Sequence, residues 1–273
     1  MHCSRARSRQ KKSNRIFRFC LSGRFLEQCI SSNGKVARGN ARVRAILLAA
    51  GLGTRLRPIT NHVPKCLVPI RGKPLLAHWL ESLWAAGISS VLINSHHHAE
   101  QVEEFVSGRP ERDLISLVYE PELRGTAGTL RVNYQFLLGE PCLVIHADNF
   151  CSADLRSFIL AHESRPVGTE ITMMTFVSDD PSSCGIIRAD GAGVVHEFYE
   201  KVANPPGNIA NGAIYIFEPS VIEFIVSMTF EEVNDISTDL LPRYLGKIFS
   251  TPADGPLVDI GTLENLSKAR AIQ

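Results

Sequence analysis

The sequence predicts an α/β protein built on a mixed, mainly parallel central sheet with helices on both of its faces. Between residues 44 and 164, short apolar segments alternate with amphipathic segments of helical period, which is typical of a parallel sheet covered on both sides. After residue 170, several strand-like segments follow one another and favour a mixed sheet. The length of 273 residues, 44% of them hydrophobic, is enough for one large core.

In the first half, apolar runs bounded by Gly or polar residues predict strands, and apolar residues three or four apart predict helices. For example, Leu76, Leu80 and Leu83 lie at helical spacing, and Gly87 is a stop signal for that helix. The predicted strands are 45–50, 91–94, 115–119 and 142–146, and the predicted helices are 73–86, 99–107, 126–138 and 155–164.

In the second half, turn signals such as Asp190-Gly191 separate runs rich in β-branched and aromatic residues. The predicted strands are 170–177, 185–188, 194–201 and 210–217, and the predicted helices are 221–226, 237–245 and 263–271. No internal repeat interrupts this order. We therefore expect one domain over residues 43–273.

Residues 1–42 differ from the rest of the chain in charge. Residues 1–44 hold 12 of the 29 Lys and Arg residues and one of the 28 acidic residues, a net charge of +11, so that the remainder has a net charge of −10. Three interpretations stay open: a disordered basic tail that touches nucleic acid or acidic surfaces, a transit peptide, and a start codon assigned too far upstream.

Composition also bears on membrane insertion and on the redox compartment of the protein. No stretch of about 18 apolar residues is present, so we expect no helix across a membrane. The seven Cys residues are scattered and form no Cys-x-x-Cys pair or zinc-ligand spacing. An odd count without a disulfide framework favours a reducing, cytoplasmic location.

A glycine-rich loop follows the first predicted strand directly. The loop, Gly51-Leu-Gly-Thr-Arg-Leu-Arg-Pro58, would let backbone N–H groups approach a phosphate closely, and its arginines add positive charge. It lacks the third Gly of a dinucleotide fingerprint, because position 56 is Leu, and it lacks the Gly-Lys-Ser/Thr of a Walker loop. Lys65, between Pro64 and a second proline at 69, is placed to reach the same phosphates.

These two motifs together resemble the nucleotidyltransferase family of sugar-phosphate pyrophosphorylases. The resemblance runs from about residue 44 to the C-terminus, and further landmarks follow in the expected order. They are Gly125-Thr-Ala-Gly128, Asp148-Asn149, Glu200-Lys201, Asn211-Gly-Ala-Ile-Tyr215, Ser237-Thr-Asp-Leu-Leu-Pro242 and Asp259-Ile-Gly-Thr262. The resemblance implies a Rossmann-like three-layer α/β fold, and the Mg²⁺-dependent joining of a nucleoside triphosphate to a sugar 1-phosphate with release of pyrophosphate.

The same resemblance implies a role for each matching residue. Asp148 and Asp259 would hold Mg²⁺, which prefers carboxylate and phosphate oxygens. Arg55 and Lys65 would be the catalytic cations at the phosphates. The implied nucleotide-binding residues are Ala50, Gly51, Gly53, Thr54, Glu120, Gly125 and Thr126, and the implied sugar-phosphate-binding residues are Gly185, Glu200, Lys201 and Asn211. Two departures from the family pattern, Ala147 before Asp148 and Val202 after Lys201, remove no charged group.

Glu120 indicates which nucleotide is used. An ionised carboxylate only accepts hydrogen bonds, and guanine offers two adjacent donors where uracil and thymine offer one. We therefore favour GTP. The alternative is that Glu120 points to solvent and that UTP or dTTP is used. The short form of the chain resembles enzymes for mannose, heptose or muramate 1-phosphate, and the sugar stays open.

Two other functions compete with nucleotidyl transfer, that of a dehydrogenase and that of a non-catalytic subunit. A nucleotide-dependent dehydrogenase would need an acidic residue about 20 positions after the glycine loop, and none lies between His62 and Arg71. A non-catalytic subunit that binds nucleotide sugars remains an alternative, although all the expected charged residues are present. We expect neither membrane nor nucleic acid as a partner, and a homo-oligomer stays open.

Overall fold

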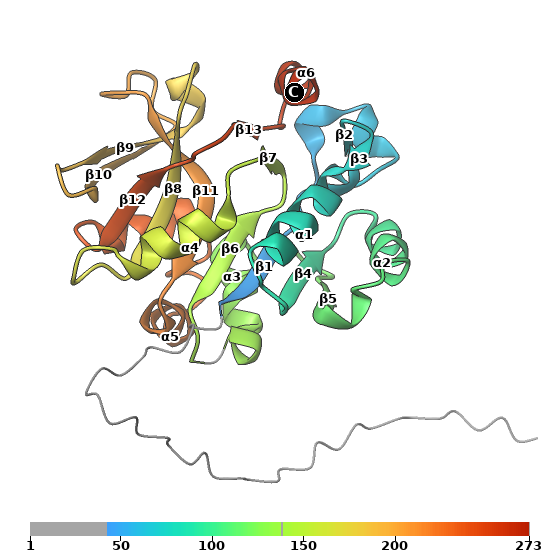
Figure 1. Cartoon of the computed structure of the whole chain (residues 1–273), viewed down its shortest axis with the longest axis horizontal. Coiled ribbons are helices and arrows are strands. Elements are labelled where there is room, and N and C mark those ends of the chain that lie inside the picture. The colour runs from blue at the N-terminus through green and yellow to red at the C-terminus, as the bar shows by residue number, and fades with distance from the viewer. Residues whose placement is uncertain (1–42, 138, 273) are drawn as a thin grey trace, which may run out of the picture. The chain divides into compact units, whose positions relative to one another are not determined.

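A nine-stranded sheet forms the centre of the structure, a computed structural model that describes residues 43–137 and 139–272 (Figure 1). In spatial order the strands are β5 (Ile115–Tyr119), β4 (Val91–Ser95), β1 (Arg44–Leu48), β6 (Cys142–His146), β11 (Ile209–Phe217), β8 (Ile171–Val177), β12 (Ile248–Pro252), β10 (Val194–Glu200) and β9 (Gly185–Ala189). The first four strands pair in parallel. β11 then runs antiparallel to both of its main neighbours, β6 and β8.

The sheet confirms the mixed α/β class but corrects the prediction of a mainly parallel sheet. Only the β5–β4, β4–β1, β1–β6 and β8–β12 pairs are parallel, and the others are antiparallel. The apolar character of a strand reports its burial on both faces and not its direction. The strands before residue 170 pair with one another in parallel as predicted, and every antiparallel pair of this sheet includes a strand that follows residue 170.

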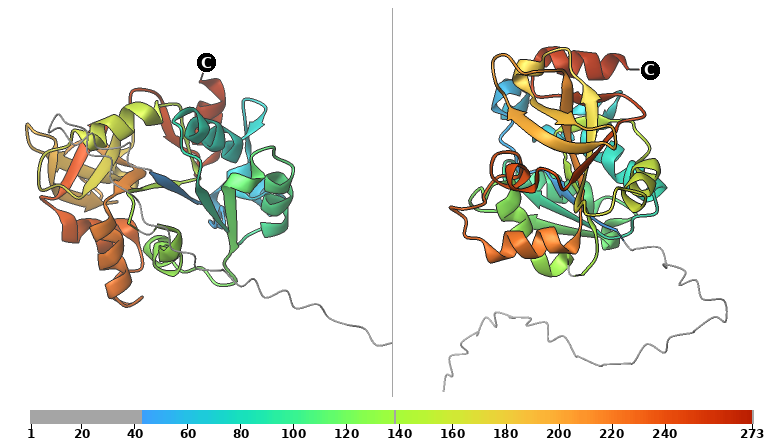
Figure 2. Two further views of the ribbon diagram at one scale, coloured as in Figure 1. Left: turned by 60° about the horizontal axis from the view of Figure 1, so that its bottom comes forward. Right: turned by 90° about the vertical axis from the view of Figure 1, so that its left-hand side faces the viewer.

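Helices cover both faces of the sheet (Figures 1 and 2). Ala45 and Leu47 of β1 belong to one core cluster, whereas Ile46 and Leu48 belong to another, as the two-residue period of a strand requires. Four helices contribute to the first core: α1 (Leu75–Ala85), α2 (Ala99–Ser107), α4 (Leu155–Glu163) and α6 (Leu263–Ala271). Two helices contribute to the second: α3 (Thr126–Val132) and α5 (Pro219–Ser227).

Short strands and single helical turns lie between the main strands and helices, and most of them were not predicted. They include β2 (Pro69–Ile70), β3 (Lys73–Pro74), β7 (Asn149–Cys151) and β13 (Leu257–Asp259). The 3-10 turns are η1 (Thr54–Leu56), η2 (Ile59–Asn61), η3 (Lys65–Leu67), η4 (Arg112–Leu114), η5 (Tyr134–Leu137), η6 (Pro181–Ser183) and η8 (Leu241–Tyr244).

Two predicted helices are wrong in part. The helix predicted over residues 126–138 ends at Val132 as α3, and η5 follows it. The helix predicted over residues 237–245 is a π-helical turn, η7 (Ile236–Leu240), followed by η8. Pro242 has no N–H to continue an α-helix at this point, and the Asp235 side chain caps the turn instead.

The basic extension predicted over residues 1–42 lies outside the described residues. Within the part of the chain that the structure describes, no helix combines the length and apolar character that crossing a bilayer requires.

His162 makes the stability of this fold depend on pH. Its Nδ1 lies 2.8 Å from Thr172 Oγ1 and its Nε2 lies 3.0 Å from Glu218 Oε1, a pairing that a neutral ring satisfies with a proton on Nε2 alone. Burial, together with the nearby Arg165 guanidinium, lowers the pKa of His162 to about 3. Below about pH 6.5 the unfolded chain binds a proton here that the folded chain does not. The free energy of unfolding therefore falls with falling pH, by up to about 1.4 kcal/mol per unit.

Urea unfolding at pH 5, 6 and 7 measures this effect. We expect His162→Gln to lose less stability than the wild type between pH 7 and pH 5, because Gln does not titrate. The exposed His196, which bonds Asp190, gives a matched control in His196→Gln. Equal pH slopes for the wild type and His162→Gln would contradict the assignment.

Candidate active site

Asp148 and Asp259, far apart in sequence, are brought together by a two-stranded ribbon. β7 starts directly after Asp148 and pairs antiparallel with β13, and Asp259 lies opposite Asn149 in the register. The Asn149 side chain donates from Nδ2 to Gly212 O at 3.1 Å, and the backbone carbonyl of Asn149 accepts from Trp79 Nε1 at 2.8 Å. Both aspartates are therefore held beside the carboxyl end of β6.

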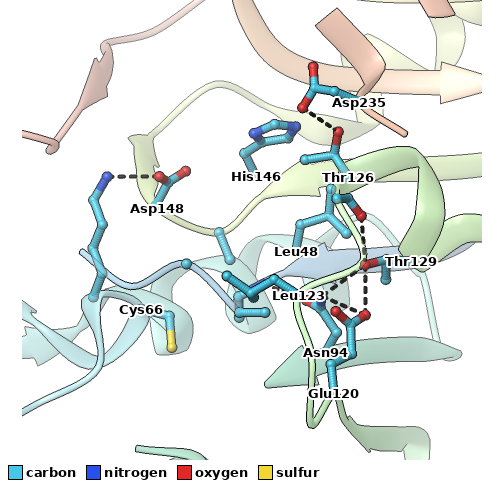
Figure 3. A pocket seen from close by; sticks show the side chains of 16 residues that line it. Leu48, Cys66, Asn94, Glu120, Leu123, Thr126, Thr129, His146, Asp148 and Asp235 are labelled. Carbon is cyan, nitrogen blue, oxygen red and sulfur yellow. Dashed lines mark hydrogen bonds and ion pairs between the residues drawn. The ribbon is translucent and has the colours of Figure 1, made fainter. Parts of the chain in front are cut away.

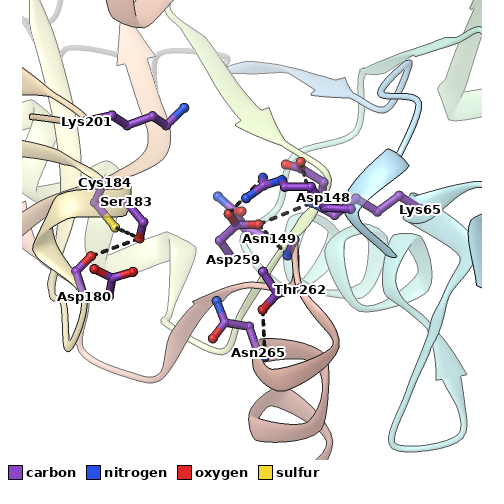
Figure 4. A network of polar contacts seen from close by, with 12 residues as sticks. Lys65, Asp148, Asn149, Asp180, Ser183, Cys184, Lys201, Asp259, Thr262 and Asn265 are labelled. Atoms are coloured by element: carbon purple, nitrogen blue, oxygen red, sulfur yellow. Dashed lines mark hydrogen bonds and ion pairs between the residues drawn. The ribbon is translucent and has the colours of Figure 1, made fainter. Parts of the chain in front are cut away.

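Lys65 connects the two aspartates (Figure 4). Its Nζ lies 2.8 Å from Asp148 Oδ2 and 3.3 Å from Asp259 Oδ1, and the residue is only 5% exposed. A buried ammonium is costly without partners, and two carboxylates offset that cost. Burial alone would raise the pKa of Asp148, but the Lys65 ammonium, the nearby His146 and the hydrogen bonds to the carboxylate together outweigh burial and hold this pKa below its ordinary value. Asp148 is thus ionised at neutral pH.

Arg55 lies on the solvent side of Lys65, Asp148 and Asp259. These four side chains form the charged cluster. Arg55 Nη2 lies 3.6 Å from Asp259 Oδ2, and the Arg55 side chain is 64% exposed. Gly261 donates its N–H to Asp259 Oδ1 at 2.8 Å, and a Cβ at Gly261 would lie 2.7 Å from Arg55 Nη2. Glycine at this position therefore leaves room for the guanidinium. An ion pair this exposed contributes little to stability, so Arg55 can turn to an arriving anion at low cost.

The donor set of the two aspartates suits Mg²⁺. In residues 43–137 and 139–272, no group of three or more His, Cys, Asp or Glu side chains is arranged to enclose a metal ion. Two partly exposed carboxylates on one side leave the other positions to water and phosphate oxygens, which is the coordination that Mg²⁺ prefers in phosphate-binding enzymes. The residues present thus fit a magnesium ion shared with a substrate.

A cavity of about 250 Å³ opens beside the charged cluster (Figure 3). Lys65 and Asp148 line one end, and Glu120 lines the other. Of the predicted nucleotide-binding residues, Ala50, Gly51, Glu120, Gly125 and Thr126 line it. Gly53 and Thr54 do not belong to its lining. Gly53 instead contacts Thr60, whose Oγ1 donates to the Gly53 carbonyl at 2.7 Å.

Glu120 is held at its end of the cavity by a buried polar network. The residue is 2% exposed, so the alternative in which it points to solvent is wrong. Its Oε1 accepts from Asn94 Nδ2 at 3.1 Å and from Thr129 Oγ1 at 2.7 Å. Asn94 in turn accepts from Ala49 N at 2.7 Å. With Oε1 occupied twice, the lone pairs of Oε2 are available to a ligand.

Besides these two ends, the segment that starts η7 forms one wall of the cavity. Thr126 Oγ1 donates to Asp235 Oδ2 at 2.9 Å and accepts from Ile236 N at 2.7 Å. The N–H groups of Ala127 and Gly128 both bond Asn234 O. These first N–H groups of α3 therefore anchor the η7 segment, and the Thr126 hydroxyl proton is already donated to Asp235.

The predicted sugar-phosphate residues lie apart from the charged cluster. Gly185 is on β9, Glu200 ends β10, Lys201 follows it directly, and Asn211 is on β11. Gly185 pairs with Glu200, and Lys201 Nζ lies 3.2 Å from Glu200 Oε1. Figure 4 shows the mostly exposed Lys201 side chain extending toward the side where Asp259 lies. The Asn211 side chain forms hydrogen bonds within a bulge of β11. Its Nδ2 donates to Tyr215 Oη, and its Oδ1 accepts from Ala213 N. The second N–H of Nδ2 and the second lone pair of Oδ1 remain for a contact to sugar.

Several residues of the site were missed by sequence reasoning. Asn94, Thr129, His146 and Asp235 all line the cavity. His146 and Asn94 stand at the carboxyl ends of β6 and β4, where open α/β sheets bind ligands, and this placement was a usable signal. Asp235 lies two residues before the recognised landmark that starts at Ser237, and it caps η7. Thr129 gave no comparable signal.

Known proteins that resemble this chain show the family to which it belongs. The sequence model of the nucleotidyl transferase family matches residues 44–272. The chain is 35% identical over 201 residues to the mannose-1-phosphate guanylyltransferase catalytic subunit beta of Drosophila pseudoobscura pseudoobscura, covering 72% of this chain and 53% of that protein. It is 30% identical over 224 residues to a Sulfolobus acidocaldarius protein described as a mannose-1-phosphate guanyltransferase, covering 80% and 60%.

A solved structure is similar as well. It is described as a glucose-1-phosphate thymidylyltransferase from Bacillus anthracis in complex with sucrose, at 26% identity and a TM-score of 0.75, covering 85% of this chain and 96% of that one. The chain spans little more than half the length of the curated relatives that it matches. The family model nonetheless covers nearly all described residues. The chain therefore belongs to the nucleotidyl transferase family.

Proposed function

We propose that this chain joins a nucleoside triphosphate, with GTP favoured, to a sugar 1-phosphate, giving a nucleotide sugar and pyrophosphate. One observation supports this most strongly. Lys65 Nζ lies within 3.3 Å of both Asp148 and Asp259, at one end of a cavity whose other end holds the buried Glu120. Such a cavity offers charge to phosphates at one end and hydrogen-bond acceptors to a base at the other.

The chemistry brings two anions together, so its main need is charge neutralisation. In this proposal a sugar-phosphate oxygen attacks the α-phosphorus in line with the departing pyrophosphate. Arg55 and Lys65 neutralise the growing charge on the phosphate oxygens, and no side chain acts as a nucleophile. Asp148 and Asp259 would hold Mg²⁺, which supplies further positive charge at the α-phosphate when bound.

The sugar 1-phosphate is proposed to bind on the β9–β10 side. Lys201 carries the charge that a phosphate needs, and Glu200 can accept hydrogen bonds from sugar hydroxyls. Gly185 lies opposite Glu200, and the Asn211 side chain supports the neighbouring bulge. Because the relatives named above are described as mannose-1-phosphate guanylyltransferases, mannose 1-phosphate is the first sugar to test.

A substrate matrix tests the proposal. GTP, UTP, dTTP, CTP and ATP are each combined with mannose, heptose, muramate and glucose 1-phosphates, and pyrophosphate release is measured with and without Mg²⁺. We expect the highest rate with GTP and a hexose 1-phosphate, and no turnover without Mg²⁺. Binding of nucleotide sugars without pyrophosphate release in any combination would instead favour the non-catalytic alternative.

Glu120→Gln tests the choice of base. The amide keeps the shape of the side chain but replaces acceptor lone pairs with N–H donors, which face the donors of guanine. We expect kcat/KM for GTP to fall by about 10- to 100-fold, from the loss of a charged hydrogen bond, and kcat/KM for UTP to fall less. Glu122→Gln, two residues away and exposed, is the matched control. An equal loss for both nucleotides would argue against a base contact.

A further inference from the structure

His146 stands on the cavity wall between the proposed phosphate end and the η7 segment. It is the last residue of β6, two residues before Asp148, and it lines the same cavity as Thr126 and Asp235. Figure 3 shows its ring lying between the Asp148 carboxylate and the Thr126–Asp235 pair. None of the proposed catalytic or binding roles above uses it.

The Nε2 atom of His146 is buried and has no hydrogen-bond partner among the described residues. Other histidines that are partly buried do find one: His78, His96 and His97 each lie within 3.0 Å of a backbone carbonyl. Leaving a buried polar nitrogen unpaired is unfavourable, and most such groups in folded proteins are satisfied. A partner from outside the polypeptide would remove this penalty.

The ring is also kept in place. It packs edge-on against Tyr215, with ring centroids 6.3 Å apart. Tyr215 is fully buried and its Oη accepts from Asn211 Nδ2 at 2.7 Å, so that this neighbour is fixed in turn. This packing holds the imidazole ring in the cavity wall.

The surroundings indicate what kind of group would bind. The carboxylates of Asp148 and Asp235 flank the ring, and phosphate is assigned above to the Lys65 end of the cavity, so a neutral group suits this position better than a second anion. A hydroxyl is neutral and can donate or accept, so it suits an imidazole nitrogen in either tautomer and a nearby carboxylate. Ring hydroxyls are the groups that lie between base and phosphate in a nucleotide, and next to the phosphate in a sugar 1-phosphate.

We propose that His146 is a specificity-determining residue whose Nε2 forms a hydrogen bond with a ring hydroxyl of a bound substrate. That hydroxyl belongs to the ribose of the nucleotide or to the sugar of the sugar 1-phosphate. The inference rests on the proposed function, because it takes both molecules as the occupants of this cavity and its rim.

Deleting one hydroxyl at a time from the ligand tests the contact. Binding of GTP, 2′-deoxy-GTP and 3′-deoxy-GTP is measured by calorimetry in magnesium buffer without sugar phosphate. In a second arm, binding and KM are measured for mannose 1-phosphate and its singly deoxygenated analogues. We expect the wild type to lose about 3- to 10-fold in affinity for one analogue, the size of a single hydrogen bond.

Two variants and one control make the test specific. His146→Phe keeps a flat ring without the nitrogen, and we expect it to bind the full and the deoxygenated ligand within twofold of each other. His146→Gln returns an N–H and is expected to restore part of the preference. His196→Gln, an exposed histidine away from the cavity, should discriminate as the wild type does. Thermal unfolding of His146→Phe without ligand should show no loss of stability, because an unpaired polar atom is removed.

The outcomes separate the contact from the activity. The ligand whose deoxygenation matters identifies the ribose or the sugar as the source of the hydroxyl. An unchanged preference in His146→Phe for every hydroxyl, or no preference in the wild type, would overturn the inference and indicate that water satisfies Nε2. Absence of pyrophosphate release with every substrate would overturn the proposed function alone, since the binding arms still decide whether His146 contacts a hydroxyl.

Discussion

Asp148→Asn and Asp259→Asn are each expected to lower turnover by about 100-fold or more. Each change removes a charged oxygen ligand of the proposed magnesium ion, and metal stabilisation of a phosphoryl transition state amounts to several kcal/mol, with 1.4 kcal/mol for each factor of ten. Because both carboxylates also pair with Lys65, either variant leaves this buried ammonium with one partner. We therefore expect both single variants to fold.

Kinetics and unfolding together check this expectation. Initial rates of pyrophosphate release are measured over a range of Mg²⁺ concentrations, beside urea unfolding. Asp113→Asn is the matched control, since that side chain is 92% exposed and lies outside the cavity lining. The double variant Asp148→Asn/Asp259→Asn should lose more stability than the two single variants combined, because Lys65 is then left unpaired. Rates near that of the wild type in both single variants would refute the magnesium assignment.

The charged cluster could be predicted from the sequence because its members lie in ordered motifs next to strand ends. Arg55, Lys65, Asp148 and Asp259 each matched a landmark, and the structure places them in mutual contact through Lys65 and Asp259. The third expected cation, Lys201, pairs with Glu200 instead and belongs to the other side of the site. The sequence placed Lys201 in the same site as the charged cluster only through the family resemblance.

What could not be predicted depends on contacts between distant segments. The ribbon of β7 and β13 has three residues in each strand, too few for a recognisable period, yet it sets the position of both aspartates. Asn94 and Thr129 read as ordinary strand and helix residues, and only the fold places them against Glu120. The orphan nitrogen of His146 is invisible in a sequence, because a histidine gives no sign of whether its partner exists.

Gly125 shows how a motif residue can act through the fold instead of through a ligand. Its φ of 70° and ψ of 167° belong to a region that only glycine adopts readily. A Cβ at this position would also lie 2.4 Å from Asn234 O, the atom that accepts from the N–H groups of Ala127 and Gly128. Glycine here therefore allows the η7 segment, with Asp235, to close one wall of the cavity.

Gly125→Ala is accordingly expected to be the most damaging small substitution in the site. Backbone strain and the forced displacement of Asn234 together should lower the free energy of unfolding by about 3 kcal/mol or more. Because Thr126 and Asp235 would separate, we also expect affinity for GTP to fall at least about tenfold, as for the loss of one or two hydrogen bonds.

Gly87→Ala separates the two causes. Gly87 also has a positive φ, 81°, but a Cβ there would meet no atom within 4 Å, so this variant carries backbone strain alone. Urea unfolding and calorimetric GTP binding are compared for both variants. If Gly125 serves the cavity wall, its variant loses more stability than Gly87→Ala and alone loses GTP affinity. Matching results for the two variants would mean that Gly125 is needed only for its backbone conformation, and that the contact with Asn234 adjusts without consequence for the nucleotide.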